Sequence, residues 1–127
     1  MHREVLRGKI HRATVTEANL DYEGSLTVDL ELIEAASLAP YEKIDVYNVT
    51  NGNRFSTYLI QGPRHSGVIC VNGAAAHLAR DGDKIIITGY GLATIAEVKT
   101  HRPRVVVVDE ENRIQQVLHE STGAALS

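Results

Sequence analysis

The sequence predicts a mainly β protein, folded as a small closed or nearly closed barrel with short helices. Three observations lead to this fold class. Runs rich in β-branched apolar residues recur along the chain, and turn-forming residues separate them. The segments that favour helix are brief, and a length of 127 residues suits one domain with a buried core. Many short strands with few helices are typical of a barrel, so we expect a single domain over residues 1–127.

The N-terminal part of the chain is expected to hold two strands. Within residues 5–15, apolar residues lie among polar ones in a run rich in β-branched types. The next strand signal is SLTV, in which Leu26 and Val28 point to one face of an extended segment. The segment LELIEAASL that follows fits either a continuation of this strand or a short helix capped by Asp29. We favour the helix, because the segment is made of helix formers and ends before a proline.

The clearest element is a β-hairpin in KIDVYNVTNGNRFSTYLI, residues 43–60. Two β-rich arms flank Asn51 and Gly52, a pair that tolerates positive φ, so we predict a tight type I′ turn. Similar local signals predict a loop at 62–67, a strand at 68–72, a turn with a short helix at 72–79, a turn at 80–83, a buried strand at 84–93, a last strand at 102–109 and a turn at 110–112. Small and polar residues near the C-terminus predict a flexible tail over about residues 110–127.

Composition and charge argue against several classes of protein. The formal net charge is −3, with 13 basic and 16 acidic residues. This balance argues against a general nucleic-acid binder, because phosphate binding depends on clustered Lys and Arg. No apolar run is long enough for a membrane helix, and the N-terminus is too charged for a signal peptide. The single cysteine, Cys70, allows no internal disulfide. We therefore expect a cytoplasmic protein that binds neither nucleic acid nor membrane.

The sequence contains no recognisable metal site or common catalytic motif. The six histidines are scattered, no HExxH or CxxC spacing occurs, and no glycine-rich phosphate loop precedes a helix. We therefore expect no metal. The pair Gly24–Ser25 lacks the context of a nucleophile elbow, and taken alone it indicates a hairpin turn. Taken alone, Lys9 and Arg54 indicate exposed strand charges, and Tyr58 indicates a core or rim aromatic.

Three motifs taken together are far more specific than any one of them. They are KIHRATVTEANLDYEGSLTVD, NVTNGNRFSTY and VNGAAAHLA, which begin at Lys9, Asn48 and Val71. In this order and spacing they resemble the bacterial aspartate 1-decarboxylases, pyruvoyl-dependent carboxy-lyases that make β-alanine for pantothenate, the precursor of coenzyme A. The resemblance extends from the first residues to about residue 109. It implies a double-psi β-barrel assembled as a homotetramer, with active sites between neighbouring subunits.

Self-cleavage of the chain between Gly24 and Ser25 is implied by the same resemblance. The precursor, a zymogen, would divide into a β chain of residues 1–24 and an α chain of residues 25–127. The Ser25 hydroxyl attacks the Gly24 carbonyl, and elimination and hydrolysis then leave a pyruvoyl group at residue 25. Glycine suits the cleavage site because it adds no Cβ to the path of attack. Thr57 resembles the family residue that assists this processing.

The resemblance also assigns catalytic and substrate-binding residues. The pyruvoyl carbonyl derived from Ser25 would form a Schiff base with the amine of L-aspartate and act as electron sink for the loss of CO2. Tyr58 matches the proton donor, since a phenol is a protonated acid at neutral pH. Arg54 and Lys9 would supply cations for the two carboxylates. The other substrate contacts implied are Thr57, Asn72, Gly73, Ala74 and Ala75, and the supporting residues implied are His11 and Tyr22.

Two alternatives stay open at the level of sequence. A pyruvoyl enzyme of this kind could act on glutamate, another small acidic amino acid. A small barrel could instead be non-catalytic and serve protein or nucleic-acid interactions. Some members of the resembled family mature unaided and others need an accessory protein, and the residues do not distinguish these two routes.

Overall fold

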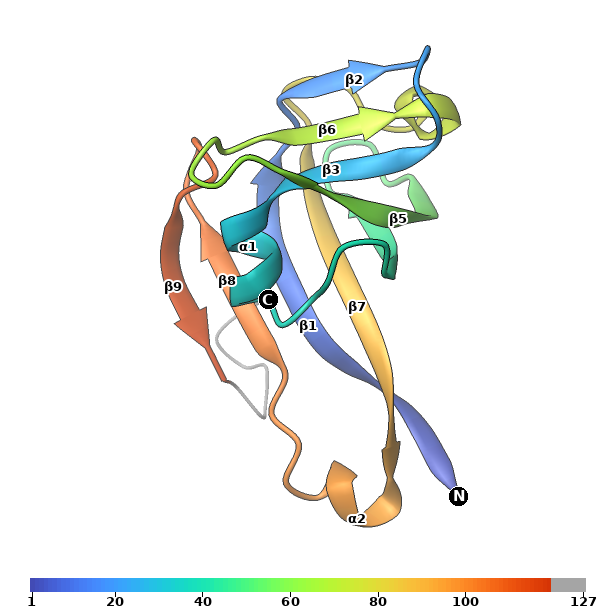
Figure 1. Ribbon diagram of the computed structural model, residues 1–127, viewed down its shortest axis with the longest axis vertical. Helices are drawn as coiled ribbons and strands as arrows, with labels where there is room; N and C mark the ends of the chain where they lie inside the picture. Colours follow the sequence, from blue (N-terminus) through green and yellow to red (C-terminus); the bar gives the residue numbers. More distant parts are fainter. Residues whose placement is uncertain (120–127) are drawn as a thin grey trace.

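The computed structural model of the protein describes residues 1–119, and strands dominate it (Figure 1). The elements in chain order are β1 (His2–Thr14), β2 (Glu17–Asn19), β3 (Ser25–Asp29), α1 (Leu30–Ala35), β4 (Lys43–Asn48), β5 (Arg54–Gly62), β6 (Ile69–Asn72), the 3-10 helix η1 (Gly73–His77), β7 (Lys84–Thr94), α2 (Ile95–Val98), β8 (Arg104–Val108) and β9 (Ile114–Leu118). No helix in this part of the chain has the length and apolar character needed to cross a membrane.

The strands form one mixed sheet that curls into a barrel. Its order is β2-β6-β3-β5-β4-β7-β1-β8-β9, with the parallel pairs β1–β8, β2–β6 and β3–β5. The chain passes from β1 to β2 through Val15 and Thr16, whose N–H groups donate to Asp83 O and Ile69 O at 2.8 Å each. Val15 and Thr16 therefore connect the start of β7 with the start of β6, and this connection closes the barrel. The predicted fold class, a mainly β barrel with short helices, is confirmed.

Alternation along the strands separates an apolar core from a polar outer face. Leu26 and Val28 of β3 point to one face, as the sequence predicts, and both are fully buried. Ser25 and Thr27 alternate with them and point to the other side of the sheet. The core is completed by side chains from neighbouring strands, chiefly Ile10, Ile44, Val46, Leu59, Ile69, Ile85 and Ile87. Each such side chain contributes about 1.5–3 kcal/mol on leaving water. This core fixes the register that places polar residues of β3, β5 and β6 on one outer face.

The short helix predicted after β3 is confirmed as α1. Asp29 caps it, and the Asp29 Oδ1 atom accepts hydrogen bonds from Glu31 N at 2.9 Å and His65 N at 3.1 Å. The Oδ2 atom accepts a third hydrogen bond from Gly67 N at 2.9 Å. A single buried carboxylate thus ties the loop after β5 to the C-terminal end of β3, which helps to fix the position of that strand.

The predicted hairpin of β4 and β5 is confirmed, but the predicted type I′ turn is wrong. A type I′ turn needs positive φ at two residues, and in this connection only Gly52 has it, at 81°. The connection spans residues 49–53, which is longer than a two-residue turn. Asn48 explains the difference, because its Oδ1 accepts hydrogen bonds from Thr50 N at 2.9 Å and Asn51 N at 3.2 Å. A side chain outside the predicted turn therefore organises the loop.

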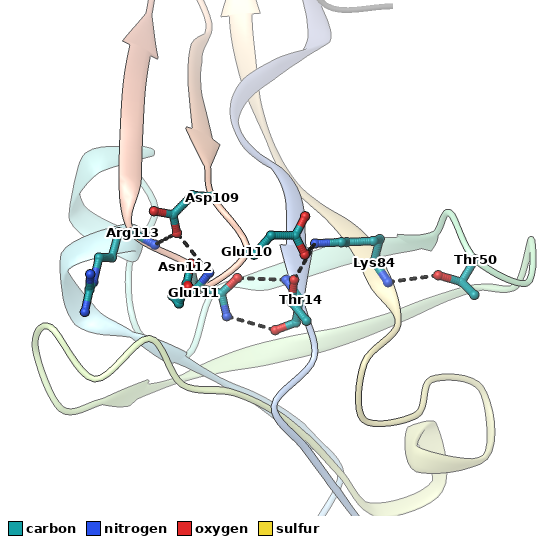
Figure 2. A network of polar contacts seen from close by, with 8 residues as sticks. All are labelled: Thr14, Thr50, Lys84, Asp109, Glu110, Glu111, Asn112 and Arg113. Atoms are coloured by element: carbon teal, nitrogen blue, oxygen red, sulfur yellow. Dashed lines mark hydrogen bonds and ion pairs between the residues drawn. The ribbon is translucent and has the colours of Figure 1, made fainter.

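The turn between β8 and β9 corrects the predicted flexible tail. Asn112 is buried there; its Oδ1 accepts from Thr14 N, and its Nδ2 donates to Thr14 O and Gly67 O, all at 2.8 Å. Figure 2 shows this turn bonded to the end of β1. β9 then pairs antiparallel with β8. A flexible tail is therefore wrong for residues 110–118, and residues 120–127 of the predicted tail lie outside the described residues.

Candidate active site

Ser25 lies at the start of β3 and is held from two sides. It is 5% exposed and pairs with Asn72 of the antiparallel neighbour β6. Its Oγ accepts a hydrogen bond from Asn72 Nδ2 at 3.0 Å and donates one to Glu23 O at 3.3 Å. The hairpin turn that Gly24–Ser25 indicates in isolation is not formed, because β2 pairs with β6 and β3 lies on the far side of β6. The pair instead marks the point where an exposed loop enters a buried strand.

The amide of Asn72 is oriented by further partners on the same face. Its Nδ2 also donates to Thr27 Oγ1 at 3.1 Å, and its Oδ1 accepts from Cys70 Sγ at 3.1 Å. Burial raises the pKa of the Cys70 thiol, and nearby Glu17 raises it further, so the thiol keeps the proton that it donates. The two N–H donors of the amide are therefore directed at the hydroxyls of Ser25 and Thr27.

Thr27 and Cys70 are site residues that the sequence analysis missed. Each lies two positions from a predicted site residue, on the strands that carry Ser25 and Asn72. Period-two alternation is the signal that could have found them, because residues two apart in a strand share a face. Their role here is to complete the hydrogen bonding of the Asn72 amide.

Gly73 allows the closest approach between η1 and the loop before β3. Its φ is +73°, and a Cβ added there would lie 2.6 Å from Gly24 N and 2.7 Å from Gly24 Cα. The Tyr22 carbonyl oxygen would lie 2.9 Å from the same Cβ. An L side chain at this position would therefore force the backbone apart. Gly24 itself is exposed, and a Cβ there meets nothing within 4 Å.

The remaining predicted residues of this region differ in exposure. Ala74 is exposed, whereas Ala75 is half-buried against the core. Because the first N–H groups of a helical turn have no partner within that turn, the backbone of Gly73, Ala74 and Ala75 offers hydrogen-bond donors next to Asn72. Tyr22 is 63% exposed, at the surface of the loop that leads to Ser25.

Tyr58 lies on β5, the parallel neighbour of β3. Leu26 pairs with Leu59, so one step back along both strands sets Ser25 beside Tyr58. Alternation gives these two residues the same outer face, and Tyr58 is half-buried. Asn72 joins them from the other side of β3. The structure thus brings Ser25, Asn72 and Tyr58 together.

Thr57 precedes Tyr58 and therefore points to the opposite side of β5. It pairs with Ile44 of β4, whose side chain belongs to the core. The β3–β5 register, continued two residues back, sets Thr57 level with Gly24, the residue before β3. Thr57 is thus placed with the cleavage pair and away from the polar residues of the outer face.

Arg54 begins β5 and lies on the same outer face as Tyr58, four residues away. That spacing is about 13 Å along an extended strand. The Arg54 guanidinium carbon lies 4.9 Å from the centre of the ring of Tyr47, its partner on β4. The Tyr47 hydroxyl oxygen is in turn 2.9 Å from the Tyr90 hydroxyl oxygen on β7. Arg54 is exposed, so an anionic ligand can reach it from solvent.

Lys9 and His11 belong to β1, which the sheet order places four strands from β3. They alternate with the fully buried Ile10 and so lie on the outer face. β1 bulges just after this point, where Arg12 has a φ of 62°. Burial, together with the charges of Lys9 and Arg12, lowers the pKa of His11, and its Nδ1 is buried without a hydrogen-bond partner among the described residues. Within one chain the paired strands do not bring these residues next to Ser25.

A cavity of about 540 Å³ opens beside the outer face. It is lined by Glu4, Lys43, Ile44, Asp45 and Tyr90. Lys43 pairs with Tyr58, so the cavity borders the strand position of the predicted proton donor. Another cavity, of about 420 Å³, lies between the loop after β5 and the β8–β9 turn, away from Ser25. Within residues 1–119 no group of three or more His, Cys, Asp or Glu side chains is arranged to hold a metal ion.

The family model described as aspartate decarboxylase matches residues 1–115. This chain belongs to the aspartate decarboxylase family. Three relatives, each named aspartate 1-decarboxylase, show how far the similarity extends. The protein of Caldicellulosiruptor saccharolyticus is 60% identical over 111 residues, 87% of each chain. The protein of Listeria monocytogenes serotype 4a is 52% identical over 120 residues, 94% of each chain. That of Bacillus velezensis is 51% identical over 118 residues, 93% of each chain. The family predicted from the three motifs is confirmed.

Among solved structures, this family member is similar to the computationally designed msDPBB_sym2 protein. The TM-score is 0.45 at 10% identity, and the similarity covers 67% of this chain and 96% of that chain. The strand pairings of this chain define its fold. The roles predicted for the individual site residues stay predictions. The structure groups Gly24, Ser25, Thr57, Tyr58, Asn72 and Gly73 and leaves Lys9 and His11 apart from them.

Proposed function

We propose that this protein decarboxylates L-aspartate to β-alanine and CO2, using a pyruvoyl group that it makes from its own Ser25. The observation that carries the proposal is the buried contact between Ser25 Oγ and Asn72 Nδ2, in a chain that belongs to the aspartate decarboxylase family. Relatives that share half or more of its residues are named for the same reaction. We further propose that the β-alanine serves pantothenate, and hence coenzyme A, synthesis in the cytoplasm.

The surroundings of Ser25 fit a pyruvoyl group derived from that residue. Asn72 Nδ2 donates to the Ser25 hydroxyl, whose oxygen leaves with Gly24. The amide then has a free N–H beside residue 25, which the ketone oxygen that replaces the Ser25 nitrogen could accept. Because Gly73 has no Cβ, the Gly24 backbone can occupy the space that a side chain at residue 73 would fill. A buried polar position with a fixed donor and no crowding side chain suits a small reactive carbonyl.

Self-cleavage uses groups that the precursor already holds in place. The Ser25 hydroxyl adds to the Gly24 carbonyl carbon, its proton passes to the departing nitrogen, and the amide becomes an ester. Asn72 holds the attacking oxygen, and Thr57, level with Gly24, is proposed to donate to the oxyanion. Loss of the Ser25 Cα proton then expels Gly24 as a carboxylate. Water then adds at Cα and the nitrogen leaves as ammonia. The new chain therefore begins with a ketone.

Tyr58 is proposed as the proton donor in the decarboxylation. Once formed, the pyruvoyl group would supply a carbonyl able to condense with an amine and to take up the electrons released with CO2. Tyr58 is half-buried and lies on the same face of the sheet as Ser25. Its phenol would give its proton to the carbon that carried the lost carboxylate.

The two carboxylates of aspartate need cations, which the proposal takes from Arg54 and Lys9. Arg54 offers a planar fork that can bind one carboxylate bidentately. Lys9 lies four strands from β3 in the sheet order, which supports a site shared between neighbouring subunits of a homotetramer. The remaining contacts proposed are Thr57, Asn72 and the backbone of Gly73, Ala74 and Ala75, with His11 and Tyr22 as supporting residues.

Intact-mass spectrometry of the purified protein tests this proposal. We expect two fragments that join between Gly24 and Ser25, whose masses add up to the precursor plus one water minus one ammonia. Ser25→Ala should stay a single folded chain and release no CO2 from aspartate. A wild-type chain that stays whole, alone and with a cell extract of the source organism, would favour a non-catalytic barrel and contradict the proposal.

The substrate is tested by comparing CO2 release from aspartate and from glutamate. Faster turnover of glutamate would contradict the assignment of aspartate. Incubation of the purified precursor by itself, beside a sample with extract, also measures whether an accessory protein is needed for maturation.

A further inference from the structure

Tyr47, Tyr90 and Arg54 form a connected group on the outer face of β4, β5 and β7. The Arg54 guanidinium lies over the Tyr47 ring, 4.9 Å from its centre. The Tyr47 and Tyr90 hydroxyl oxygens are 2.9 Å apart and share a hydrogen bond. A cation over one aromatic ring is a common surface contact. A second tyrosine that fixes the direction of that ring is an added constraint, and no step of the proposed reaction uses it.

The strand register shows which way the two rings lean. Tyr47 pairs with Arg54 across β4 and β5. In the antiparallel β4–β7 ladder Asp45 pairs with Thr88, so Tyr90 is level with Lys43. Lys43 is four residues from Tyr47, which is about 13 Å along the strand. For the two hydroxyl oxygens to lie 2.9 Å apart, the side chains must extend toward each other along the sheet.

Because the Tyr47 ring points along the sheet toward Tyr58, the Arg54 guanidinium that lies over this ring is also placed on the side of the predicted proton donor. The position on β4 level with Tyr90 is Lys43, and Lys43 pairs with Tyr58. The Tyr47 ring therefore extends from the Arg54 end of β5 toward the Tyr58 end, and the guanidinium lies over this ring. A ligand bound near Tyr58 would meet a guanidinium already held on that side.

The Tyr90 hydroxyl is held by its hydrogen bond to Tyr47, and the exposed Arg54 can bind an anion. Burial raises the pKa of Tyr90, and its hydrogen bond to Tyr47 raises it further, so the phenol keeps a proton to share. Within residues 1–119 no acidic side chain forms an ion pair with Arg54. A guanidinium stacked on a ring keeps its in-plane N–H groups free for a carboxylate.

We propose that Tyr47 and Tyr90 are positioning residues that hold the Arg54 guanidinium where it binds a carboxylate of the amino-acid substrate. The inference rests on the proposed function, in which Arg54 contacts that substrate. Tyr47 supplies the ring face, Tyr90 fixes the ring through the hydrogen bond, and neither needs to touch the substrate. A guanidinium held in a fixed position also distinguishes amino acids by the distance between their two carboxylates. The pair therefore favours aspartate over glutamate, whose second carboxylate lies one methylene farther away.

Single and double Tyr→Phe variants test the hydrogen bond. Tyr47→Phe and Tyr90→Phe should each raise the KM for aspartate about threefold, leave kcat unchanged and lower the preference for aspartate over glutamate. The double variant should be no worse than either single variant, because both changes remove the same bond. Tyr47→Leu removes the ring as well, and it should raise the KM by about tenfold.

A matched control and a folding check separate positioning from structure. Tyr41→Phe removes a hydroxyl from a side chain that is 77% exposed, and it should change neither constant. All variants should be cleaved to completion in an intact-mass spectrum, and incomplete cleavage of Tyr90→Phe would mark a structural role and overturn the inference. An unchanged KM in Tyr90→Phe and Tyr47→Leu, or additive effects in the double variant, would also overturn it.

Arg54→Ala, measured alongside, separates a failure of this inference from a failure of the proposed function. If Arg54→Ala raises the KM for aspartate and the tyrosine variants do not, the inference alone is wrong. If Arg54→Ala leaves that KM unchanged, the proposed contact of Arg54 with substrate is wrong, and the positioning pair with it. Support requires Arg54→Ala and Tyr47→Leu to raise the same constant.

Discussion

The surroundings of Ser25 and the cations of the outer face are built in opposite ways. Ser25, Asn72 and Cys70 are buried and joined by hydrogen bonds of 3.0 and 3.1 Å within one chain. Lys9 lies on β1, which three strands separate from β3. Arg54 lies on β5, which adjoins β3, and its side chain is exposed. Because it is buried and hydrogen-bonded within the chain, we infer that the first region is rigid, whereas the second is open and spread over the surface.

The contrast matches the two stages of the proposed function. Self-cleavage is intramolecular, so it needs Gly24 and Ser25 held in one geometry by the rest of the chain. Substrate binding needs cations that aspartate reaches from solvent, on long side chains that extend from the outer face. Changes in the rigid region should therefore slow cleavage, and changes on the open face should raise the KM of the cleaved enzyme.

The largest effect is expected from Gly73→Ala, in the rigid region. The new Cβ would lie 2.6 Å from Gly24 N, at a φ of +73° that L residues avoid. We expect cleavage to slow by at least about a hundredfold, since strain and clash together exceed the roughly 2.7 kcal/mol that a hundredfold change requires. A time course of precursor and fragment masses measures this rate.

Gly82→Ala is the matched control for that experiment. Gly82 has a φ of +92°, and a Cβ there meets nothing within 4 Å. The substitution therefore imposes a similar backbone cost without a clash near Gly24, and cleavage should proceed at the normal rate. Equal cleavage rates for Gly73→Ala and Gly82→Ala would show that the close approach of Gly73 and Gly24 has no part in processing.

A smaller effect on cleavage is expected from Asn72→Ala. The change removes the donor to Ser25 Oγ and leaves the buried Cys70 thiol without its acceptor. Loss of such contacts costs about 1–3 kcal/mol, so cleavage should slow by roughly tenfold to a hundredfold. Thr27→Val removes only the second acceptor of the amide and should slow cleavage much less. Normal cleavage of Asn72→Ala would contradict the role given to this contact.

An effect of about tenfold, confined to the KM, is expected from Lys9→Ala, and this variant separates the two regions. Loss of a charge-assisted contact to a substrate carboxylate should raise the KM for aspartate by about tenfold. Cleavage should proceed normally, because Lys9 lies on β1, away from Ser25 in the sheet order. Lys99→Ala, at an exposed lysine, is the control and should leave the KM unchanged. Slow cleavage of Lys9→Ala would mean that the two regions are not independent.

Sequence reasoning succeeded where neighbouring residues decide the structure. The helix after β3 is set by its cap, Asp29, and by helix formers that follow at once. The arms of the β4–β5 hairpin are set by alternation. The loop between those arms was predicted wrongly because the Asn48 side chain, outside the local turn signal of Asn51 and Gly52, accepts its backbone N–H groups.

Contacts between distant segments were beyond local signals. β2 follows β1 in the chain and pairs with β6, and Asn112 bonds to Thr14, 98 residues away. The turn at 110–112 was predicted from its local sequence, but the bonds that Asn112 makes with Thr14 could not be. The motifs identified Ser25 and Asn72, but the contact of Thr27 with Asn72 depends on the register of β3 against β6.

The central claim is that this chain makes its own reactive carbonyl at residue 25. Borohydride trapping tests it most directly: mature protein is treated with borohydride and aspartate, and the larger fragment is then analysed by mass spectrometry. We predict an adduct derived from the amino acid at the N-terminus of that fragment, absent without aspartate and absent from Ser25→Ala. A cleaved, assembled wild-type protein that gives no adduct at this terminus would contradict the claim.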